Sequence, residues 1–156
     1  MNRKLRALGL PGLTVKRHMT ANVITVRPDT SVWKAWDLLQ THEISYLPVV
    51  QGGRLVGIIS DGDLRLLLPS SLAMPEEQER FRTWGTQVKV GDVMTRKVVT
   101  VSRETRTDSA VQLMVKHHIG CMPVLRGSSL VGIFTTMDVL RALADNGGVN
   151  ATAPGK

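Results

Sequence analysis

Apolar and polar positions alternate along the chain in two stretches that follow the same plan. Each stretch opens with a short apolar run of strand composition, at residues 23–26 and again at 98–101. Apolar residues spaced by three and four positions then predict an amphipathic helix within 32–39 and another within 110–114. A strand followed by a one-faced helix therefore begins each stretch.

A hydroxyl side chain precedes each predicted helix. Thr30 or Ser31 is the expected N-cap of the first helix, and Thr105 is the expected N-cap of the second. Each helix is followed by two apolar runs around a glycine-containing turn, which is the pattern of a β-hairpin, and then by a second helical segment. These segments are 47–50, 55–60 and 62–68 in the first stretch and 122–125, 130–135 and 137–144 in the second.

The two stretches are copies of one another. A shift of 75 positions aligns residues 15–66 with 90–141 without a gap, and 19 of the 52 positions are identical. Each copy reads strand–helix–strand–strand–helix, and a unit of this size buries too little surface to be stable alone. The sequence therefore predicts an α/β (α+β) fold of two tandem repeats packed with pseudo-two-fold symmetry.

The remaining segments divide the chain further. We expect residues 1–12 to form a flexible basic arm and 145–156 a flexible tail. The repeats are assigned to 13–68 and 89–144, and a linker with one short helix is assigned to 69–88.

Charge and composition narrow the function. The net charge is +7, but residues 1–18 hold five basic and no acidic side chains, which leaves 15 basic and 13 acidic side chains for the rest. A basic arm can bind phosphates, so nucleic-acid binding is one alternative. No apolar run approaches the roughly 20 residues of a membrane helix. The single cysteine excludes a disulfide framework and a cysteine-rich zinc site, and we expect a cytoplasmic protein.

Two related heptapeptides carry the candidate chemistry. Residues 57–63 and 132–138 both end a predicted strand and open a predicted helix, with Ser60 and Asp63 in the first and Thr135 and Asp138 in the second. A hydroxyl with a carboxylate three residues later is a helix-capping pattern. The same groups at a helix N-terminus can also bind a phosphate or the hydroxyls of a ribose, and both interpretations stay open.

The duplication, the repeated Met-Thr pairs at 19–20 and 94–95, the Leu-Pro-Val-Val strand at 47–50 and the two heptapeptides together resemble the tandem CBS (cystathionine β-synthase) domain pair, or Bateman module. The resemblance covers residues 13–144. It implies a regulatory module whose repeats bind an adenosyl ligand such as AMP, ADP, ATP or S-adenosylmethionine in clefts between them. It also implies a homodimer that modulates an unidentified partner protein.

The resemblance further implies which residues bind the ligand. Asp63 and Asp138 correspond to the ribose-binding aspartates, and Ser60 and Thr135 to the hydroxyls beside them. The segments that flank the adenine correspond to Thr25, Tyr46, Leu47 and Pro48 in the first repeat and to Thr100, Cys121, Met122 and Pro123 in the second.

The chain departs from the family just before each Leu-Pro or Met-Pro step. Family members that hold phosphates tightly often have basic residues there, where this chain has Ser45-Tyr46 and Gly120-Cys121. Phosphate contacts would then come from elsewhere. The leading candidates are Arg103, Arg106 and His118, and the further ones are Arg27, Lys34 and Arg65. This favours AMP, ADP or a less anionic adenosyl ligand over tightly bound ATP.

We expect no catalytic residues, no metal site and no obligatory cofactor. The sequence has no nucleophile elbow, P-loop or metalloprotease helix. The thiol of Cys121 lies in an apolar strand, where a raised pKa would make it unreactive. The chain is therefore predicted to be a ligand sensor rather than an enzyme.

Overall fold

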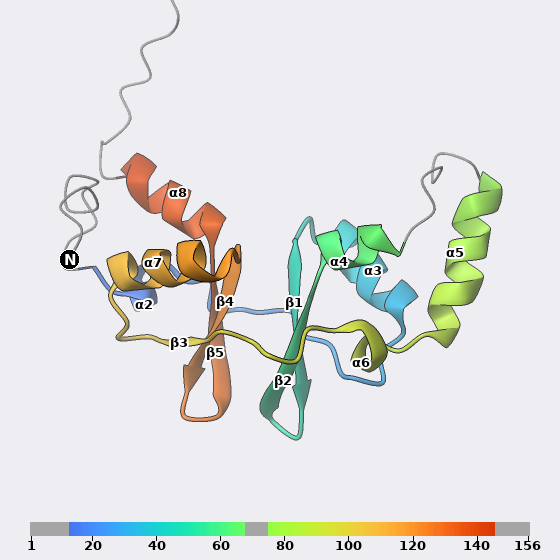
Figure 1. Ribbon diagram of the computed structural model, residues 1–156, viewed down its shortest axis with the longest axis horizontal. Helices are drawn as coiled ribbons and strands as arrows, with labels where there is room; N and C mark the ends of the chain where they lie inside the picture. Colours follow the sequence, from blue (N-terminus) through green and yellow to red (C-terminus); the bar gives the residue numbers. More distant parts are fainter. Residues whose placement is uncertain (1–12, 68–74, 146–156) are drawn as a thin grey trace, which may run out of the picture. The chain divides into compact units, whose positions relative to one another are not determined.

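A computed structural model describes residues 13–67 and 75–145 of the chain (Figure 1). The predicted arm at 1–12, the tail after residue 145 and part of the predicted linker lie outside the described residues. The described residues form two compact units, which we call the Asp63 unit and the Asp138 unit. The Asp63 unit comprises 23–67, 75–98 and 127–130, and the Asp138 unit comprises 13–22, 99–126 and 131–145.

Both units combine helices with a β-hairpin, which confirms the predicted mixed fold of two repeats. The Asp63 unit contains α3 (Val32–Thr41), β1 (Tyr46–Gln51), β2 (Arg54–Ser60), α4 (Asp61–Leu66), α5 (Pro75–Gln87) and α6 (Val90–Val93). The Asp138 unit contains α2 (Val15–His18), β3 (Val101–Ser102), α7 (Thr107–His117), β4 (Cys121–Arg126), residues 131–135 of β5 (Ser129–Thr135) and α8 (Thr136–Asp145).

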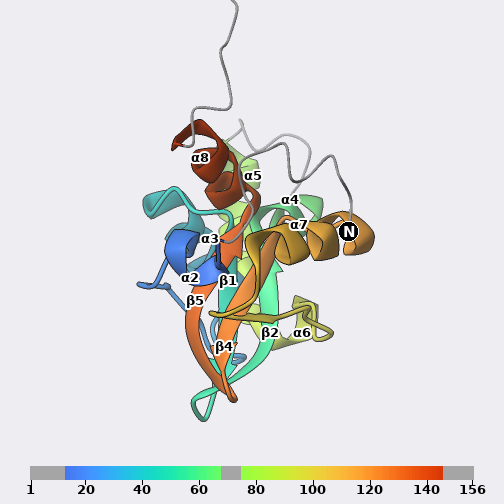
Figure 2. The ribbon, with the colours of Figure 1, turned by 90° about the vertical axis from the view of Figure 1, so that its left-hand side faces the viewer.

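The first strand of each repeat is shorter than the apolar runs suggest. In the Asp63 unit it is reduced to a single parallel bridge between Val26 and Val49. In the Asp138 unit it forms β3, which pairs in parallel with β4 at Val124 and Leu125. Figure 2 looks onto the Asp138 unit and shows α8 at the end of the β4–β5 hairpin that is remote from the turn.

The spatial units exchange the leading segments of the sequence repeats. Thr20, which begins the first repeat, exchanges two backbone hydrogen bonds of 2.9 Å with Ile133 of β5. Thr95, which begins the second repeat, bonds in the same way to Ile58 of β2, at 2.9 and 3.0 Å. Each compact unit is therefore assembled from both halves of the chain.

Two glycines allow these crossings. A Cβ on Gly57 would lie 2.5 Å from the Met94 Sδ atom and 3.0 Å from the Thr95 carbonyl oxygen. A Cβ on Gly132 would lie 2.8 Å from the Met19 Sδ atom. Only glycine leaves room for such an approach. In each unit, the repeated Met-Thr pair therefore packs directly against the repeated glycine.

One predicted helix cap is confirmed and one is wrong. The Ser31 hydroxyl caps α3 by accepting a 3.2 Å hydrogen bond from the Lys34 N–H. Thr105 does not cap α7, because its hydroxyl instead accepts a 3.0 Å bond from the Ser102 N–H and stabilises the preceding loop. The N-cap residue of α7 is Arg106, and its side chain makes no capping hydrogen bond.

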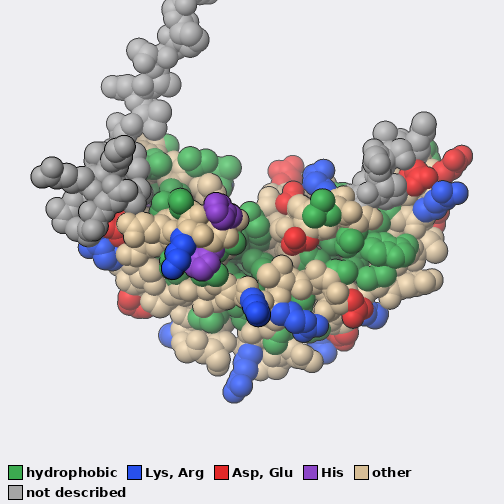
Figure 3. All heavy atoms as spheres, in the orientation of Figure 1, with side chains coloured by type: hydrophobic (Ala, Val, Ile, Leu, Met, Phe, Trp, Pro, Cys, Tyr) green, Lys and Arg blue, Asp and Glu red, His purple; other side chains and the backbone are tan. Residues whose placement is uncertain are grey.

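The linker helix α5 packs against α3 and extends the core of the Asp63 unit. The Phe81 ring meets Trp33, Trp36 and Trp84 at centroid distances of 5.7, 6.1 and 5.8 Å. Such aromatic contacts add to the free energy gained by burying the rings. Figure 3 shows the hydrophobic surface that gathers between α3 and α5.

The crossing of β2 makes a testable prediction. We expect Gly57→Ala to lower the free energy of unfolding by about 1–3 kcal/mol, because the added methyl group overpacks against Met94 and the Thr95 carbonyl. Denaturant unfolding measures this change. Gly62→Ala is the matched control, because its Cβ meets nothing closer than the Ser60 hydroxyl at 3.6 Å. Equal unfolding free energies for the two variants would contradict the close approach.

A buried hydroxyl in α7 makes a second prediction. Thr107 is fully buried and its Oγ1 atom has no hydrogen-bond partner, whereas the equivalent residue of the first repeat, Val32, is an equally buried valine. Thr107→Val should raise the unfolding free energy by about 1 kcal/mol, because an unsatisfied buried hydroxyl is costly. Thr105→Val, which removes a bonded hydroxyl, should lower it in the same denaturation assay. A destabilised Thr107→Val variant would show that this hydroxyl is satisfied.

Candidate functional site

The first candidate group lies where β2 passes into α4. The Ser60 N–H and hydroxyl donate to Oδ2 of Asp63 at 2.8 and 2.7 Å, and the Asp63 N–H donates back to the Ser60 hydroxyl at 3.0 Å. This is a complete capping box, so the capping interpretation of the heptapeptide is correct. The second carboxylate oxygen, Oδ1, takes part in none of these bonds, and Asp63 is half-buried. The box therefore leaves one carboxylate oxygen for a ligand.

The second candidate group repeats this geometry with one difference. The Thr135 N–H and hydroxyl donate to Oδ2 of Asp138 at 2.8 and 2.9 Å, and the Asp138 N–H donates back at 3.3 Å. Here Oδ1 lies 3.6 Å from a guanidinium nitrogen of Arg141, and the Asp138 side chain is only 4% exposed. Leu66 takes the place of Arg141 in the first repeat. The two aspartates therefore occupy equivalent positions, but only Oδ1 of Asp138 already lies near a cationic side chain.

Hairpin register brings the predicted adenine-flanking segments beside these boxes. Tyr46 pairs with Ser60, and Pro48 with Ile58, across β1 and β2. The helix start is tied to the residue before the strand in both units, since the Asp61 N–H donates to the Ser45 carbonyl at 3.0 Å and the Thr136 N–H to the Gly120 carbonyl at 2.9 Å. Each unit therefore assembles its strand entry and its capping box at one end of the hairpin.

The side chains of the strand entries mostly face inward. Leu47 and Met122 are fully buried members of the two hydrophobic cores. Pro48 and Pro123 are also buried. These buried residues support the strand entries, while the more exposed groups beside them belong to the starts of α4 and α8.

Thr25 and Thr100 lie on the neighbouring first strands. The Val26 N–H donates to the Pro48 carbonyl at 3.1 Å, which places Thr25, an exposed residue, beside the strand entry. Thr100 precedes Val101, which pairs with Val124 of β4. The structure therefore brings each threonine close to the Pro-containing strand of its own unit.

Cys121 is buried at the start of β4. Burial raises the pKa of its thiol well above the usual range, and the negative charge of Asp138 raises this pKa further. The thiol stays protonated at neutral pH, in agreement with the expectation that it is unreactive. The bond from the Thr136 N–H to the Gly120 carbonyl places the start of α8 beside the residue that precedes Cys121.

The three leading phosphate candidates are not gathered at one place, since Arg106 and His118 lie at opposite ends of α7. The segment that carries Arg103 and Arg106 lies beside α2, because the Lys16 N–H donates to the Arg103 carbonyl at 3.0 Å. Arg106 is already held by Asp108 through bonds of 3.0 and 2.8 Å, and this pair lowers the pKa of the Asp108 carboxyl. His118 ends α7 with a left-handed backbone (φ 53°), three residues before Cys121, and is exposed.

Sequence reasoning missed Arg141 as part of the second candidate group. The signal was available, because a residue three positions after Asp138 on a helix lies on the same face. It also missed the backbone bonds from Asp61 to Ser45 and from Thr136 to Gly120, which depend on contacts between distant parts of the sequence.

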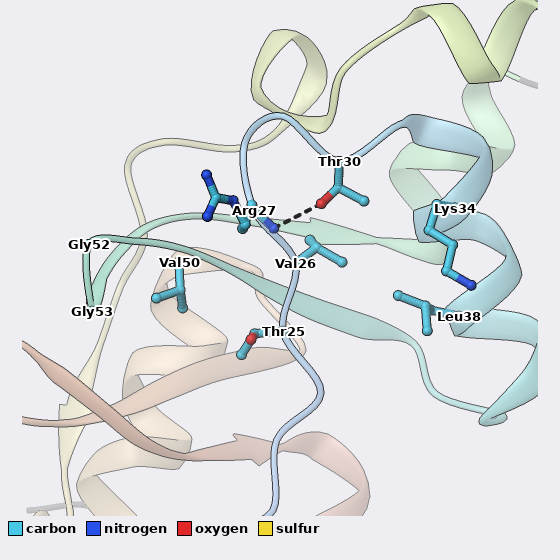
Figure 4. Close-up of a pocket in the computed structure, with 9 residues that line it drawn as sticks. All are labelled: Thr25, Val26, Arg27, Thr30, Lys34, Leu38, Val50, Gly52 and Gly53. Atoms are coloured by element: carbon cyan, nitrogen blue, oxygen red, sulfur yellow. Dashed lines mark hydrogen bonds between the residues drawn. The ribbon is translucent and has the colours of Figure 1, made fainter.

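One cavity of the Asp63 unit, of about 440 Å³, lies apart from the capping box (Figure 4). Of the predicted site residues only Thr25 lines it. Within residues 13–67 and 75–145, no three His, Cys, Asp or Glu side chains are grouped to hold a metal ion. Over the same residues, no helix has the length and apolar character needed to cross a membrane.

Known proteins with similar sequences share this repeat. The profile of the CBS domain matches residues 15–70 and again 90–145. The CBS domain-containing protein YhcV of Bacillus subtilis is 31% identical over 128 residues, which cover 81% of this chain and 82% of that protein. Inosine-5'-monophosphate dehydrogenase of Methanocaldococcus jannaschii is 33% identical over 122 residues, but this chain spans only 21% of the length of that enzyme.

Solved structures with the same fold include two ligand complexes. The structure of CBSX2 in complex with AMP is 34% identical, has a TM-score of 0.70 and covers 86% of this chain and 98% of its own. The CBS domain pair of protein MJ0100, in complex with 5'-methylthioadenosine and S-adenosyl-L-methionine, is 27% identical with a TM-score of 0.70 and the same two coverages. The duplicated profile match and these likenesses together show that the chain belongs to the CBS domain family, as a tandem pair.

Proposed function

We propose that this protein is a regulatory module that binds an adenosyl ligand and modulates a partner protein. The observation that carries the proposal is the capping box of Asp63, which leaves Oδ1 outside its hydrogen bonds beside the entry of β1. An ionised carboxylate oxygen only accepts hydrogen bonds, so it suits the hydroxyls of a ribose. The AMP complex of CBSX2 and the adenosyl complexes of MJ0100 support this class of ligand.

The two repeats should differ in affinity. Asp63 is half-buried and forms no ion pair with any of the described residues, whereas Oδ1 of Asp138 lies 3.6 Å from Arg141 in a side chain that is 4% exposed. A ligand hydroxyl at Asp138 must compete with a guanidinium group. We infer that the first repeat provides the stronger ribose contact.

The charges near Asp63 favour a ligand with few phosphates. Arg65, on the same helix, lies 3.6 Å from Asp61 and 5.6 Å from the centre of the Trp36 ring, so its charge is already engaged. Arg103 and Arg106 belong to the other compact unit, where Arg106 is already engaged by Asp108. AMP or an adenosyl compound with a positive sulfonium therefore fits these surroundings better than ATP.

Regulation would follow from differential binding. A ligand that contacts the strand entry and the helix start stabilises the arrangement in which both are correctly placed. A partner that recognises this arrangement then binds with an affinity that depends on the ligand. The protein acts in this way without catalysing a reaction of its own.

Ligand binding makes the third prediction. Calorimetric titration with AMP and S-adenosylmethionine should detect selective binding, with GTP as the nucleotide that fails. Asp63→Ala should weaken binding about 10- to 100-fold, because a hydrogen bond to a charged group contributes about 1.5–3 kcal/mol. Asp138→Ala should weaken it less, because Arg141 already engages that carboxylate.

The control separates binding from stability. Asp63→Ala also removes a helix cap, at a cost of about 1 kcal/mol in unfolding free energy. Ser31→Ala removes the cap of α3 at a comparable cost but leaves the site unchanged. If Asp63→Ala and Ser31→Ala both lose binding, the loss is due to lowered stability. If Asp63→Ala and Asp138→Ala both bind like the wild type, the ribose assignment is refuted.

We also propose that the protein forms a homodimer through the last helices of its repeats. Met137 and Leu140 of α8 are 54% and 53% exposed, and Leu66 and Leu67 at the end of α4 are 86% and 38% exposed. Figure 3 shows the hydrophobic surface that follows α8. Large apolar side chains grouped on a surface mark an interaction site, and in both units they lie on the helix that follows the hairpin.

The homodimer is the fourth prediction. The protein should sediment as a dimer, and the double variant Met137→Glu/Leu140→Glu should sediment as a monomer, because buried carboxylates at the interface repel and lose hydration. Val115→Glu is the control, since Val115 is 70% exposed on α7, away from α8 in the sequence. A wild-type monomer, or a double variant that remains dimeric, would refute the proposed interface.

A further inference from the structure

The cavity of the Asp63 unit has a place and a lining of its own. It is an open hollow bordered by the segment before α3, by one side of α3 and by the turn of the β1–β2 hairpin (Figure 4). Its lining residues are Thr25, Val26, Arg27, Thr30, Lys34, Leu38, Val50, Gly52 and Gly53. Because Tyr46 pairs with Ser60 at one end of the hairpin and Gln51 with Arg54 at the other, the cavity lies at the end opposite the capping box.

The lining carries two cationic side chains and no acidic one. Arg27 and Lys34 supply two positive charges, and Thr25 and Thr30 supply hydroxyls. The Thr30 oxygen accepts a 3.0 Å bond from the Arg27 N–H, which leaves the Thr30 hydroxyl proton free to donate. A lining of this kind selects an anion.

The two cations are held only loosely by their present partners. Arg27 pairs with Asp29 and Lys34 with Asp37, each at 3.0 Å. All four side chains are about half exposed or more, at 72% and 68% for the first pair and 58% and 49% for the second. Ion pairs as exposed as these contribute little to stability, so a ligand anion can replace the aspartates.

Apolar side chains separate the two charges. Figure 4 shows Val26 between Arg27 and Lys34, with Leu38 next to Lys34. Val26 is 5% exposed and forms a floor, while Leu38 and Val50 are half-buried walls. The volume of about 440 Å³ lies within the range of small-molecule sites. A ligand with an apolar body and an anionic group therefore fits better than a bare inorganic anion.

The second repeat shows that the fold does not require the two cations. At the equivalent positions it keeps both threonines and the apolar residues, as Thr100, Thr105, Val101, Leu113 and Leu125. The Ser102 N–H also donates to the Thr105 hydroxyl at 3.0 Å, as Arg27 does to Thr30. Both charges are absent, because Ser102 and Ser109 stand where the first repeat has Arg27 and Lys34, and Ser128 stands in place of Gly53.

We propose that this cavity is a second ligand site for a small organic phosphomonoester, in which Arg27 holds the phosphate, the apolar body lies over Val26, and Lys34 adds a positive charge on the other side of Val26. A phosphomonoester carries close to two negative charges at neutral pH, which matches two cations, and its oxygens suit the planar fork of a guanidinium group. The site lies at the far end of the hairpin from Asp63 and does not depend on adenosyl binding there.

The test uses phenyl phosphate as the probe and the backbone amide signals of Gly52, Gly53 and Thr25 in ¹⁵N-correlated NMR spectra. Phenyl phosphate should shift these signals in a saturable way. Inorganic phosphate should bind at least tenfold more weakly, because it leaves the apolar floor uncovered, and benzyl alcohol should produce no saturable shift. Signals that do not respond to phenyl phosphate would overturn the proposal.

Matched variants assign the effect to the cavity. Arg27→Ser/Lys34→Ser installs the residues of the second repeat and should raise the dissociation constant at least tenfold. Arg80→Ser/Lys97→Ser removes the same charge from exposed positions outside the cavity and should leave binding unchanged. Equal weakening by both pairs would show mere attraction to a basic protein and would overturn the site. Asp63→Asn should bind phenyl phosphate like the wild type, so failure of the ribose site and failure of this cavity are distinguishable.

Discussion

The close crossing of each hairpin by a Met-Thr segment is the contact on which the rest of the structure depends. At Gly57 and Gly132 the strand has no side chain, so the backbone of Thr95 or Thr20 reaches hydrogen-bonding distance of the next strand residue. The crossing places Val90 and Val15 in the two hydrophobic cores, where both are fully buried. Because each segment comes from the other repeat, neither copy of the sequence completes a core by itself.

The site is built from groups that also stabilise the fold. The capping boxes of Ser60 with Asp63 and of Thr135 with Asp138 satisfy backbone N–H groups at the start of α4 and α8. Each box uses the Oδ2 atom of its aspartate, so the Oδ1 atom takes no part in capping. The structural and functional interpretations of the heptapeptides are therefore compatible, because a carboxylate has two oxygens and capping requires only one.

Duplication has preserved the backbone while the charges around it have diverged. Leu66 in one repeat corresponds to Arg141 in the other, and the pair Arg27 and Lys34 corresponds to two serines. The backbone bonds around these positions are the same in both units, as at Thr30 and Thr105. Since long-range electrostatics and ligand choice depend on side-chain charge rather than on the shared backbone, the two units present different binding surfaces.

The sequence by itself determined the duplication, the hairpins and the helices that flank them, and it offered capping as one of two interpretations of the heptapeptides. Each of these rests on spacing within a few residues or on a constant shift between copies. Only the tertiary structure decided that α2 and α6 belong to the opposite repeat and that Arg106, not Thr105, precedes α7. It also decided that Asp138 faces Arg141 and that Arg27 and Lys34 line one cavity. These features arise where separate segments pack together, and hydrophobic periodicity specifies which face of a segment is buried but not what it is buried against.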